Sequence, residues 1–157
     1  AVYHSGPLYY LSPRGAVFTQ QTAQEWATEN QEMTFLCGRF EGIDERILEK
    51  WPFQEISIGD FVLSGGEPAL ITMLDATIRL LPSVMGNAAS GAEESFTDGL
   101  LEYPQYTKPA VWQGREVPAV LLSGHQAKIR QWRLEQAENI TKTRRPDLWT
   151  KYLANQQ

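Results

Sequence analysis

The stretch MTFLCGRFEGIDERILEKW (33–51) decides the fold class. Its first five residues form a continuous apolar run, which is typical of a strand buried on both faces in a parallel sheet. Gly38 and Gly42 then flank a short polar loop. A short helix is predicted over 43–51, and Pro52 ends it because proline cannot continue a helix. A strand that leads through a glycine loop into a helix indicates an α/β protein.

The flanking segments continue this alternation of strands and helices. A strand is predicted over 8–11 (LYYL), a polar helix over 19–30, and a second strand over 55–63, interrupted at Gly59-Asp60. A further helix is predicted over 68–81, where an apolar stripe recurs at helical spacing. The residues of this stripe are Leu70, Ile71, Leu74, Ile78 and Leu81.

Composition excludes several classes of protein. The 157 residues are 42% apolar and 21% charged, which is ordinary for a globular domain and excludes wholesale disorder, collagen and a coiled coil. The single cysteine, Cys37, excludes an intramolecular disulfide and a cysteine-rich zinc site. Neither a membrane-spanning apolar run nor a secretory signal is present in the sequence, so the expected compartment is the cytoplasm.

The C-terminal third differs in charge from the rest of the chain. Residues 1–124 carry 7 basic and 16 acidic side chains, a formal charge of −9, whereas residues 125–157 carry 7 and 3, a charge of +4. A basic tail on an acidic body suits binding of a polyanion. A solvated helix with a chance excess of arginine is the alternative. A helix is predicted over 125–143, and Pro146 suits the start of a last short helix.

Two glycine-rich loops are candidate ligand sites. The loop at Gly38–Gly42 follows a predicted strand, and ligands of α/β sheets bind beyond the carboxyl ends of strands. The alternative is a tight connection in which Arg39 and Glu41 are only solvated. The segment SIGDFVLSGGE (57–67) has three glycines, whose backbone N–H groups could hold a cofactor, although neither nucleotide-binding fingerprint is present. A simple turn is the alternative there.

Two further groups of charged residues invite a functional interpretation. Asp75 and Arg79 lie four residues apart on a predicted helix, where they could form a structural ion pair. Glu93 and Glu94 lie in the small, polar stretch 86–99, the best candidate for a linker. A carboxylate on a mobile loop could act as a general base. A solvated acidic turn is the alternative.

Taken together, the motifs resemble one family, the bacterial TrmD tRNA (guanine-N-1)-methyltransferases. The matching runs occur in the family's order across essentially the whole chain. They are YLSPRG (10–15), CGRFEGIDER (37–46), SIGDFVLSGGE (57–67), RLLP through MGN (79–87), EESF (93–96), GLLEYPQYTKP (99–109), LLSGHQAKI (121–129) and RRPDLW (144–149).

The resemblance implies a trefoil-knotted α/β methyltransferase of the SPOUT class, with a parallel sheet and a helical C-terminal domain. It divides the chain into a cofactor domain (1–86), a linker (87–98) and a tRNA-binding region (99–157). It also implies a homodimer with its active site at the subunit interface, and an N-terminal segment that this sequence is expected to lack. Members usually have Tyr where Phe40 and Phe61 stand.

The family binds S-adenosylmethionine in its knot. By matching positions, the cofactor contacts are expected at Leu11, Pro13, Gly38, Glu41, Gly42, Ile58, Gly59, Asp60, Phe61, Val62, Leu63, Gly65 and Gly66.

The implied reaction moves a methyl group to N-1 of the tRNA guanine on the 3′ side of the anticodon. Glu94 matches the family's acid-base aspartate, and Arg79 matches its supporting arginine. The resemblance also implies magnesium, for which the sequence names no ligand. Because basic side chains supply sequence-independent affinity for nucleic acid, four arginines are expected to contact tRNA. These are Arg130, Arg133, Arg144 and Arg145. The alternative is a non-catalytic fragment that binds RNA or a nucleotide.

Overall fold

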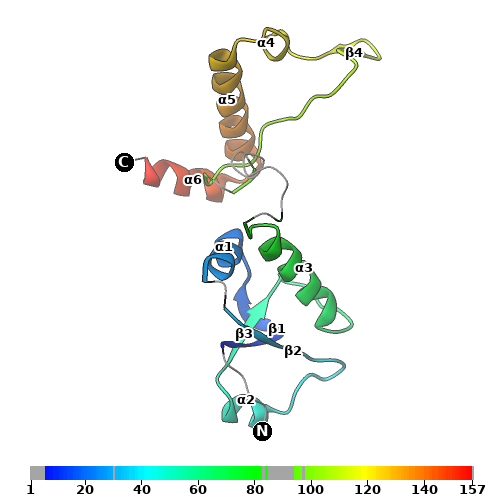
Figure 1. The fold of residues 1–157 in the computed structure, drawn as a ribbon, viewed down its shortest axis with the longest axis vertical. Helices are drawn as coiled ribbons and strands as arrows, with labels where there is room; N and C mark the ends of the chain where they lie inside the picture. Colours follow the sequence, from blue (N-terminus) through cyan, green and yellow to red (C-terminus); the bar gives the residue numbers. More distant parts are fainter. Residues whose placement is uncertain (1–5, 30, 83, 85–93, 97, 157) are drawn as a thin grey trace. The chain divides into compact units, whose positions relative to one another are not determined.

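The computed structural model describes most of the chain as two compact units, Ala1–Ala88 and Ala89–Gln157 (Figure 1). Most of the predicted linker, including Glu93, lies outside the described residues. Within those residues, no helix is both long and apolar enough to cross a membrane. The described residues are 6–29, 31–82, 84, 94–96 and 98–156.

The first unit contains a parallel three-stranded sheet, which confirms the predicted α/β class. Its strands are β1 (Leu8–Val17), β2 (Thr34–Cys37) and β3 (Phe53–Ser57), in the order β2-β1-β3 (Figure 1). The prediction that 33–37 is buried on both faces was wrong. β2 lies at the edge of this sheet and is half-buried, whereas the central β1 buries residues 8–12. Only β1 has a hydrogen-bonded neighbour on each side in this sheet.

Helices α1 (Gln20–Glu29) and α3 (Glu67–Ile78) pack against each other and contribute to the core of this unit. In that core the Trp26 indole N–H donates a 3.1 Å hydrogen bond to the Tyr9 hydroxyl, and the two rings lie 4.7 Å apart. The core cluster comprises Tyr9, Leu11, Trp26, Ile56, Ala69 and Met73. The short helix α2 (Glu45–Lys50) begins at Asp44, whose carboxylate accepts the Arg46 N–H, and ends at Trp51.

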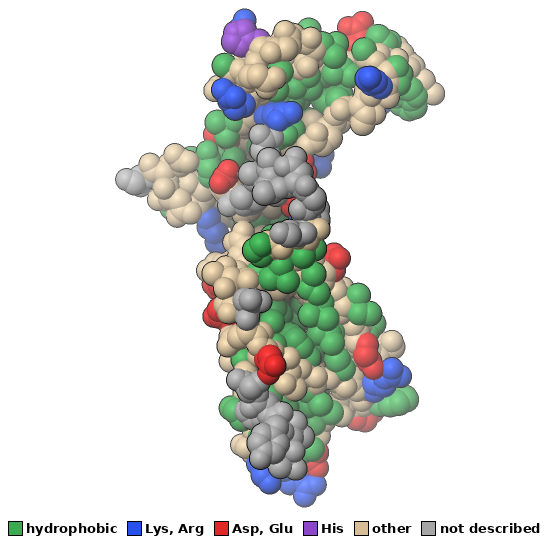
Figure 2. All heavy atoms as spheres, viewed as in Figure 1, with side chains coloured by type: hydrophobic (Ala, Val, Ile, Leu, Met, Phe, Trp, Pro, Cys, Tyr) green, Lys and Arg blue, Asp and Glu red, His purple; other side chains and the backbone are tan. Residues whose placement is uncertain are grey.

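The buried face of α3 differs from the apolar stripe seen in the sequence. Ala69, Met73 and Thr77, four residues apart, are its buried residues. Ile71 is 67% exposed and Ile78 is 45% exposed. In Figure 2 hydrophobic side chains gather on the surface along α3. The helix starts close to the sheet, because a Cβ on Gly66 would lie only 3.0 Å from the Cys37 Cα.

The second unit is mainly helical. Its helices are α4 (Ala119–Leu122), α5 (Gln126–Arg144) and α6 (Pro146–Asn155), and α5 contacts both others. Pro146 stands in the first turn of α6, as predicted. The sequence analysis missed a small hairpin, β4 (Val111–Trp112) and β5 (Arg115–Glu116), whose two turn residues both have positive φ. That turn is the usual two-residue hairpin connection.

Thr141 lies at the centre of the second unit, with no exposed surface. Its hydroxyl donates a 2.7 Å hydrogen bond to the Ala137 carbonyl and accepts one of 2.8 Å from the Leu101 N–H. Leu100 is buried as well. The hydrogen bond to Thr141 therefore holds the segment around Leu100 and Leu101 against α5.

Candidate functional site

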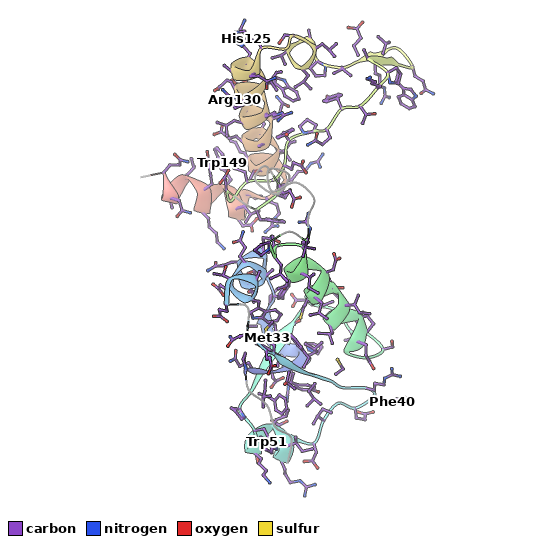
Figure 3. The ribbon with its side chains drawn as sticks, in the orientation of Figure 1. Met33, Phe40, Trp51, His125, Arg130 and Trp149 are labelled. Atoms are coloured by element: carbon purple, nitrogen blue, oxygen red, sulfur yellow. The ribbon has the colours of Figure 1, made fainter. Side chains whose placement is uncertain are left out.

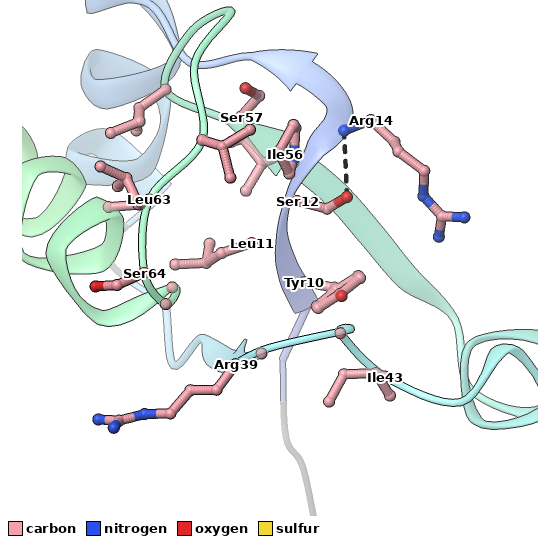
Figure 4. A pocket seen from close by; sticks show the side chains of 18 of the residues that line it. Tyr10, Leu11, Ser12, Arg14, Arg39, Ile43, Ile56, Ser57, Leu63 and Ser64 are labelled. Carbon is pink, nitrogen blue, oxygen red and sulfur yellow. Dashed lines mark hydrogen bonds between the residues drawn. The ribbon is translucent and has the colours of Figure 1, made fainter.

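A cavity of about 420 Å³ lies in the first unit, where β2 and β3 end (Figure 4). Three segments that are far apart in the sequence line it. They are residues 10–14 of β1, the loop 38–43 after β2, and the segment from the end of β3 to Gly66, which leads into α3. Figure 4 shows Leu11, from the first of these segments, pointing toward the loop that carries Leu63 and Ser64. The site is therefore built at the strand ends, where the sequence placed it.

The cavity groups nearly all of the residues expected to contact the cofactor. Asp60 is the exception, because it does not line the wall. Binding of a ligand by these residues remains a prediction. The residues that line the cavity are Leu11, Pro13, Gly38, Glu41, Gly42, Ile58, Gly59, Phe61, Val62, Leu63, Gly65 and Gly66.

Backbone contacts join the two glycine loops. The Gly66 N–H donates a 3.0 Å hydrogen bond to the Gly38 carbonyl, and an isolated β-bridge links Arg39 to Gly65. The Arg39 side chain also pairs with Glu67, with Nη2 2.7 Å and Nε 2.8 Å from the Glu67 Oε1. The pKa of Glu67 is held below its ordinary value by its own backbone N–H and then by Arg39. Sequence analysis missed this pair because its partners are 28 residues apart.

Left-handed backbone shapes the first loop. Gly42 has φ of 92°, and a Cβ there would lie 2.9 Å from the Tyr10 hydroxyl. Glycine adopts this conformation without steric cost, so position 42 requires it. Phe40 also has a positive φ, 51°, and its side chain is fully exposed at the loop (Figure 3).

A second cavity, about 210 Å³, lies in the second unit and includes the predicted base Glu94. Glu94 is half-buried. Two of the arginines predicted to bind tRNA, Arg130 and Arg133, also line this cavity. The Arg133 guanidinium carbon lies 4.7 Å from the centre of the Tyr103 ring, within the range of a cation–π contact. Sequence analysis did not anticipate this grouping, because these residues are far apart in the chain.

The four predicted tRNA-binding arginines lie in different surroundings. Arg130 and Arg144 are exposed on α5, and Figure 3 marks Arg130 there. Arg133 is half-buried against Tyr103. Arg145 pairs with Asp147, with Nη2 and Oδ2 2.6 Å apart. The hydrogen bond from Arg145 lowers the pKa of Asp147 from 3.8 to about 2.

The other predicted catalytic residue, Arg79, lies in the first unit. It is half-buried at the C-terminal end of α3, and its backbone N–H donates to the Asp75 carbonyl. The ion pair expected between the Asp75 and Arg79 side chains remains a prediction.

The structure gives no ligand set for magnesium. Among the described residues there is no group of three or more His, Cys, Asp or Glu side chains placed to hold a metal ion. The residues that the structure describes therefore do not form a recognisable metal site.

A parallel α/β unit with a glycine-lined cavity beyond its strands is typical of the class of proteins that bind small molecules. Comparison with known proteins makes this specific. Residues 3–151 match the model of the family described as tRNA (Guanine-1)-methyltransferase TrmD, and the chain belongs to that family.

Several bacterial relatives named tRNA (guanine-N(1)-)-methyltransferase are similar along almost the whole chain. One from Cereibacter sphaeroides is 57% identical over 148 residues, which cover 94% of this chain and 59% of the relative. One from Gluconobacter oxydans is 56% identical over 151 residues, covering 96% and 64%. One from Rhodospirillum rubrum is 56% identical over 149 residues, covering 95% and 62%. The chain thus spans about three fifths of the length of these relatives.

Proposed function

We propose that the chain forms the cofactor-binding and tRNA-binding parts of an S-adenosylmethionine-dependent tRNA methyltransferase. The reaction transfers a methyl group to N-1 of the guanine on the 3′ side of the anticodon. One observation carries the proposal: the family match spans residues 3–151, and the positions matched to the cofactor gather around one cavity.

The cavity suits S-adenosylmethionine in size, lining and charge. Small-molecule sites typically occupy about 300–1,000 Å³, and the 420 Å³ here falls in that range. Its glycines let the backbone approach a ligand closely. Residues 1–88 as a whole carry five basic and eleven acidic side chains, a charge of −6, which favours approach of a cationic ligand, while the charged lining residues Arg14, Arg39, Glu41 and Glu45 balance one another. When bound, the cofactor supplies a methyl group activated by its sulfonium.

Proton transfer is assigned to Glu94. The N-1 proton of the guanine must leave before the nitrogen can attack, and a carboxylate within hydrogen-bond reach acts as the general base. The half-buried position of Glu94 beside a cavity supports this role. Arg79 is proposed to stabilise the negative charge that develops on the guanine. No step is assigned to magnesium, because no metal site is recognisable among the described residues.

The remaining features of the family are also part of the proposal. The knotted SPOUT topology is assigned to 1–86, the linker to 87–98 and the tRNA-binding region to 99–157, acting in the cytoplasm. A homodimer is proposed, with its active site at the subunit interface. The exposed apolar side chains of α3, Ile71 and Ile78, support the dimer because a second chain could cover them.

Calorimetry with S-adenosylmethionine tests the cofactor assignment. A Cβ on Gly65 would lie 2.6 Å from Glu67 Oε2, at the flexible end of that side chain, and 3.4 Å from the Arg39 Cγ. The nearest backbone atom, the Gly38 oxygen, would be at an ordinary contact distance of 3.6 Å. Gly65→Val should therefore keep the fold, fill part of the cavity and weaken binding strongly, with Gly65→Ala intermediate. Gly66 is a poorer choice, because its Cβ would press on the backbone of β2. Unchanged affinity in folded Gly65→Val would overturn the assignment.

Methylation of tRNA transcripts tests the substrate. The chain should transfer the methyl group to a transcript with guanine beside the anticodon and not to one with adenine there. If tRNA and cofactor bind but no methyl group is transferred, the chain is a non-catalytic RNA-binding fragment.

A further inference from the structure

The cavity has one wall that does not belong to the regular sheet. Leu11 and Ala16 of β1 both pair with Ile56 of β3, so residues 12–15 loop out of the ladder as a bulge. Glycine at position 15 allows the loop to lie close against β3, because a Cβ there would be only 2.2 Å from the Ile56 backbone nitrogen. Ser12 and Pro13, at the start of the bulge, line the cavity. The position of the bulge therefore sets the shape of the site.

The Arg14 side chain ties this bulge to two other elements. Its Nε and Nη2 lie 3.0 Å from the two carboxylate oxygens of Glu55 on β3, and its Nη1 lies 3.3 Å from the Glu45 Oε2 in the first turn of α2. The Arg14 backbone N–H also donates to the Ser12 hydroxyl, at 3.2 Å. In Figure 4 the Arg14 side chain extends away from Leu11 and Leu63. Arg14 and Glu45 themselves also line the cavity, so the pair borders the site as well as the bulge.

The geometry of these ion pairs indicates that Arg14 fixes the position of the bulge and adds little to the unfolding free energy. The Arg14 and Glu45 side chains are 56% and 62% exposed, and exposed ion pairs contribute little to unfolding free energy. A two-pronged arginine–carboxylate contact nevertheless fixes both partners in one orientation. Glu55, at 30% exposure, gives the guanidinium a partly shielded anchor on β3. Loss of Arg14 should therefore loosen the bulge while the sheet stays folded.

We infer that Arg14 is a positioning residue, which holds Ser12 and Pro13 as a preformed wall of the cofactor cavity by bridging β3 and α2. This inference rests on the proposed function, since it takes S-adenosylmethionine to be the ligand. Preorganised walls strengthen binding because the ordering cost is met before the ligand arrives.

Calorimetry with S-adenosylmethionine tests the inference on the chain as it stands. Arg14→Met should weaken binding about tenfold, the equivalent of roughly 1.4 kcal/mol, with little change in melting temperature. Arg14→Lys, which keeps the charge without the planar fork, should recover part of the affinity. Glu55→Gln should also weaken binding, and the double variant with Arg14→Met should lose less than the two single losses combined.

Arg46→Met is the matched control. Arg46→Met removes the same charge as Arg14→Met. In the wild type, Arg46 pairs with Asp44 at the start of α2 and does not line the cavity. The variant should bind the cofactor as the wild type does. An equal loss in Arg46→Met would show that net charge matters and not position, which would overturn the inference.

Hydrogen exchange gives a second readout that needs no ligand. Backbone amides of residues 14–16 should exchange faster in Arg14→Met, while those in α1 stay as protected as in the wild type. Unchanged exchange would overturn the inference even if affinity falls, because Arg14 also lines the cavity and the lost affinity would then reflect a direct contact with the ligand. Failure of the wild type to bind the cofactor would overturn the proposed function, and the exchange rates would still decide whether Arg14 holds the bulge.

Discussion

The two units are built around different kinds of centre. The largest fully buried side chains are Met73 in the first unit and Thr141 in the second. Met73 lies in an apolar cluster with Tyr9, Leu11 and Trp26, whereas the Thr141 hydroxyl makes two hydrogen bonds to backbone. The two centres therefore differ in kind: apolar packing surrounds Met73, whereas directed hydrogen bonds hold Thr141.

The cavities differ in a parallel way. The cavity of the first unit is lined largely by glycine-rich loops, so backbone atoms form much of its wall. The cavity of the second unit has charged side chains, including Glu94, Arg130 and Arg133, set among apolar ones such as Leu101 and Leu134. Backbone atoms remain when a side chain is substituted, whereas the charge of Glu94, Arg130 or Arg133 is lost with its side chain. The chemistry should thus be most sensitive to single substitutions in the second unit.

The largest expected effect is on Glu94. Glu94→Gln removes the proposed base and should slow single-turnover methyl transfer about 10²–10⁴-fold, with cofactor affinity unchanged. Glu94→Asp should keep most activity. The control is Glu135→Gln on α5, where the carboxylate is exposed and accepts from Gln131. Wild-type rates in Glu94→Gln would place the proton transfer elsewhere.

Met73→Ala tests the apolar centre of the first unit. Truncating a fully buried methionine should lower the unfolding free energy by about 2–5 kcal/mol, measured by denaturant titration. Ile71→Ala, on the same helix but exposed, should stay within about 0.5 kcal/mol at low protein concentration. A cost for Ile71→Ala that grows with protein concentration would support the proposed dimer. Equal costs at low concentration would contradict the observed buried face of α3.

Thr141→Val tests the polar centre of the second unit. The isosteric change leaves the Leu101 N–H without its hydroxyl acceptor, which should cost about 1–3 kcal/mol. Thr143→Val is the control: Thr143 is exposed and its hydroxyl only donates to the Asn139 carbonyl, so its change should stay within about 0.5 kcal/mol. Equal losses of unfolding free energy in the two variants would show that the buried hydrogen bonds of Thr141 do not stabilise the second unit.

Two neighbouring arginines should differ in tRNA binding. Arg144→Ala should flatten the dependence of log affinity on log salt by about 0.7–0.9, the loss of one phosphate contact. Arg145→Ala should change it less, because the Arg145 guanidinium already pairs with Asp147. Filter binding across a salt series measures both slopes. Equal changes would mean that the Arg145 pair opens on tRNA.

The smallest effect is a pH dependence at the start of α6. Arg145 lowers the pKa of Asp147 from 3.8 to about 2, so the pair stabilises the folded state above about pH 4. This contribution is lost as the pH falls through about 2. An NMR titration should find the Asp147 midpoint near 2, and near 3.8 in Arg145→Ala. A midpoint that does not move would remove Arg145 as the cause.

Local patterns predicted much of the fold, while contacts between distant segments escaped prediction. Pro52 and Pro146 correctly marked a helix end and a helix start because their ring restricts the backbone wherever they occur. The buried face of α3 was not evident from its apolar stripe, because a helix apolar on several sides gives no unique inner face. The close approach of Gly66 to Cys37, which brings the start of α3 near the sheet, is likewise not visible in the apolar pattern.

In the candidate site, too, contiguous motifs were predictable from the sequence and contacts between distant segments were not. The glycine loops were recognised from the sequence because their residues are contiguous, and the structure gathers them around one cavity. The contacts of Arg14 with Glu45 and Glu55, and the meeting of Glu94 with Arg133, depend on segments 31 to 41 residues apart. Charge alone does not reveal such pairings, because many combinations satisfy the same composition.

The hydrogen bond between Trp26 and Tyr9 has an optical consequence. Trp26 is 4% exposed and surrounded by aromatic rings, whereas Trp112 in the second unit is 57% exposed. A shielded indole emits at shorter wavelength than one in contact with water. Exposure of Trp26 as the sheet opens should shift its emission to the red, whereas Trp112 should change little. Trp51, Trp132 and Trp149 are half-buried, so Trp26 becomes a label-free reporter of the first unit once the other four tryptophans are replaced by Phe.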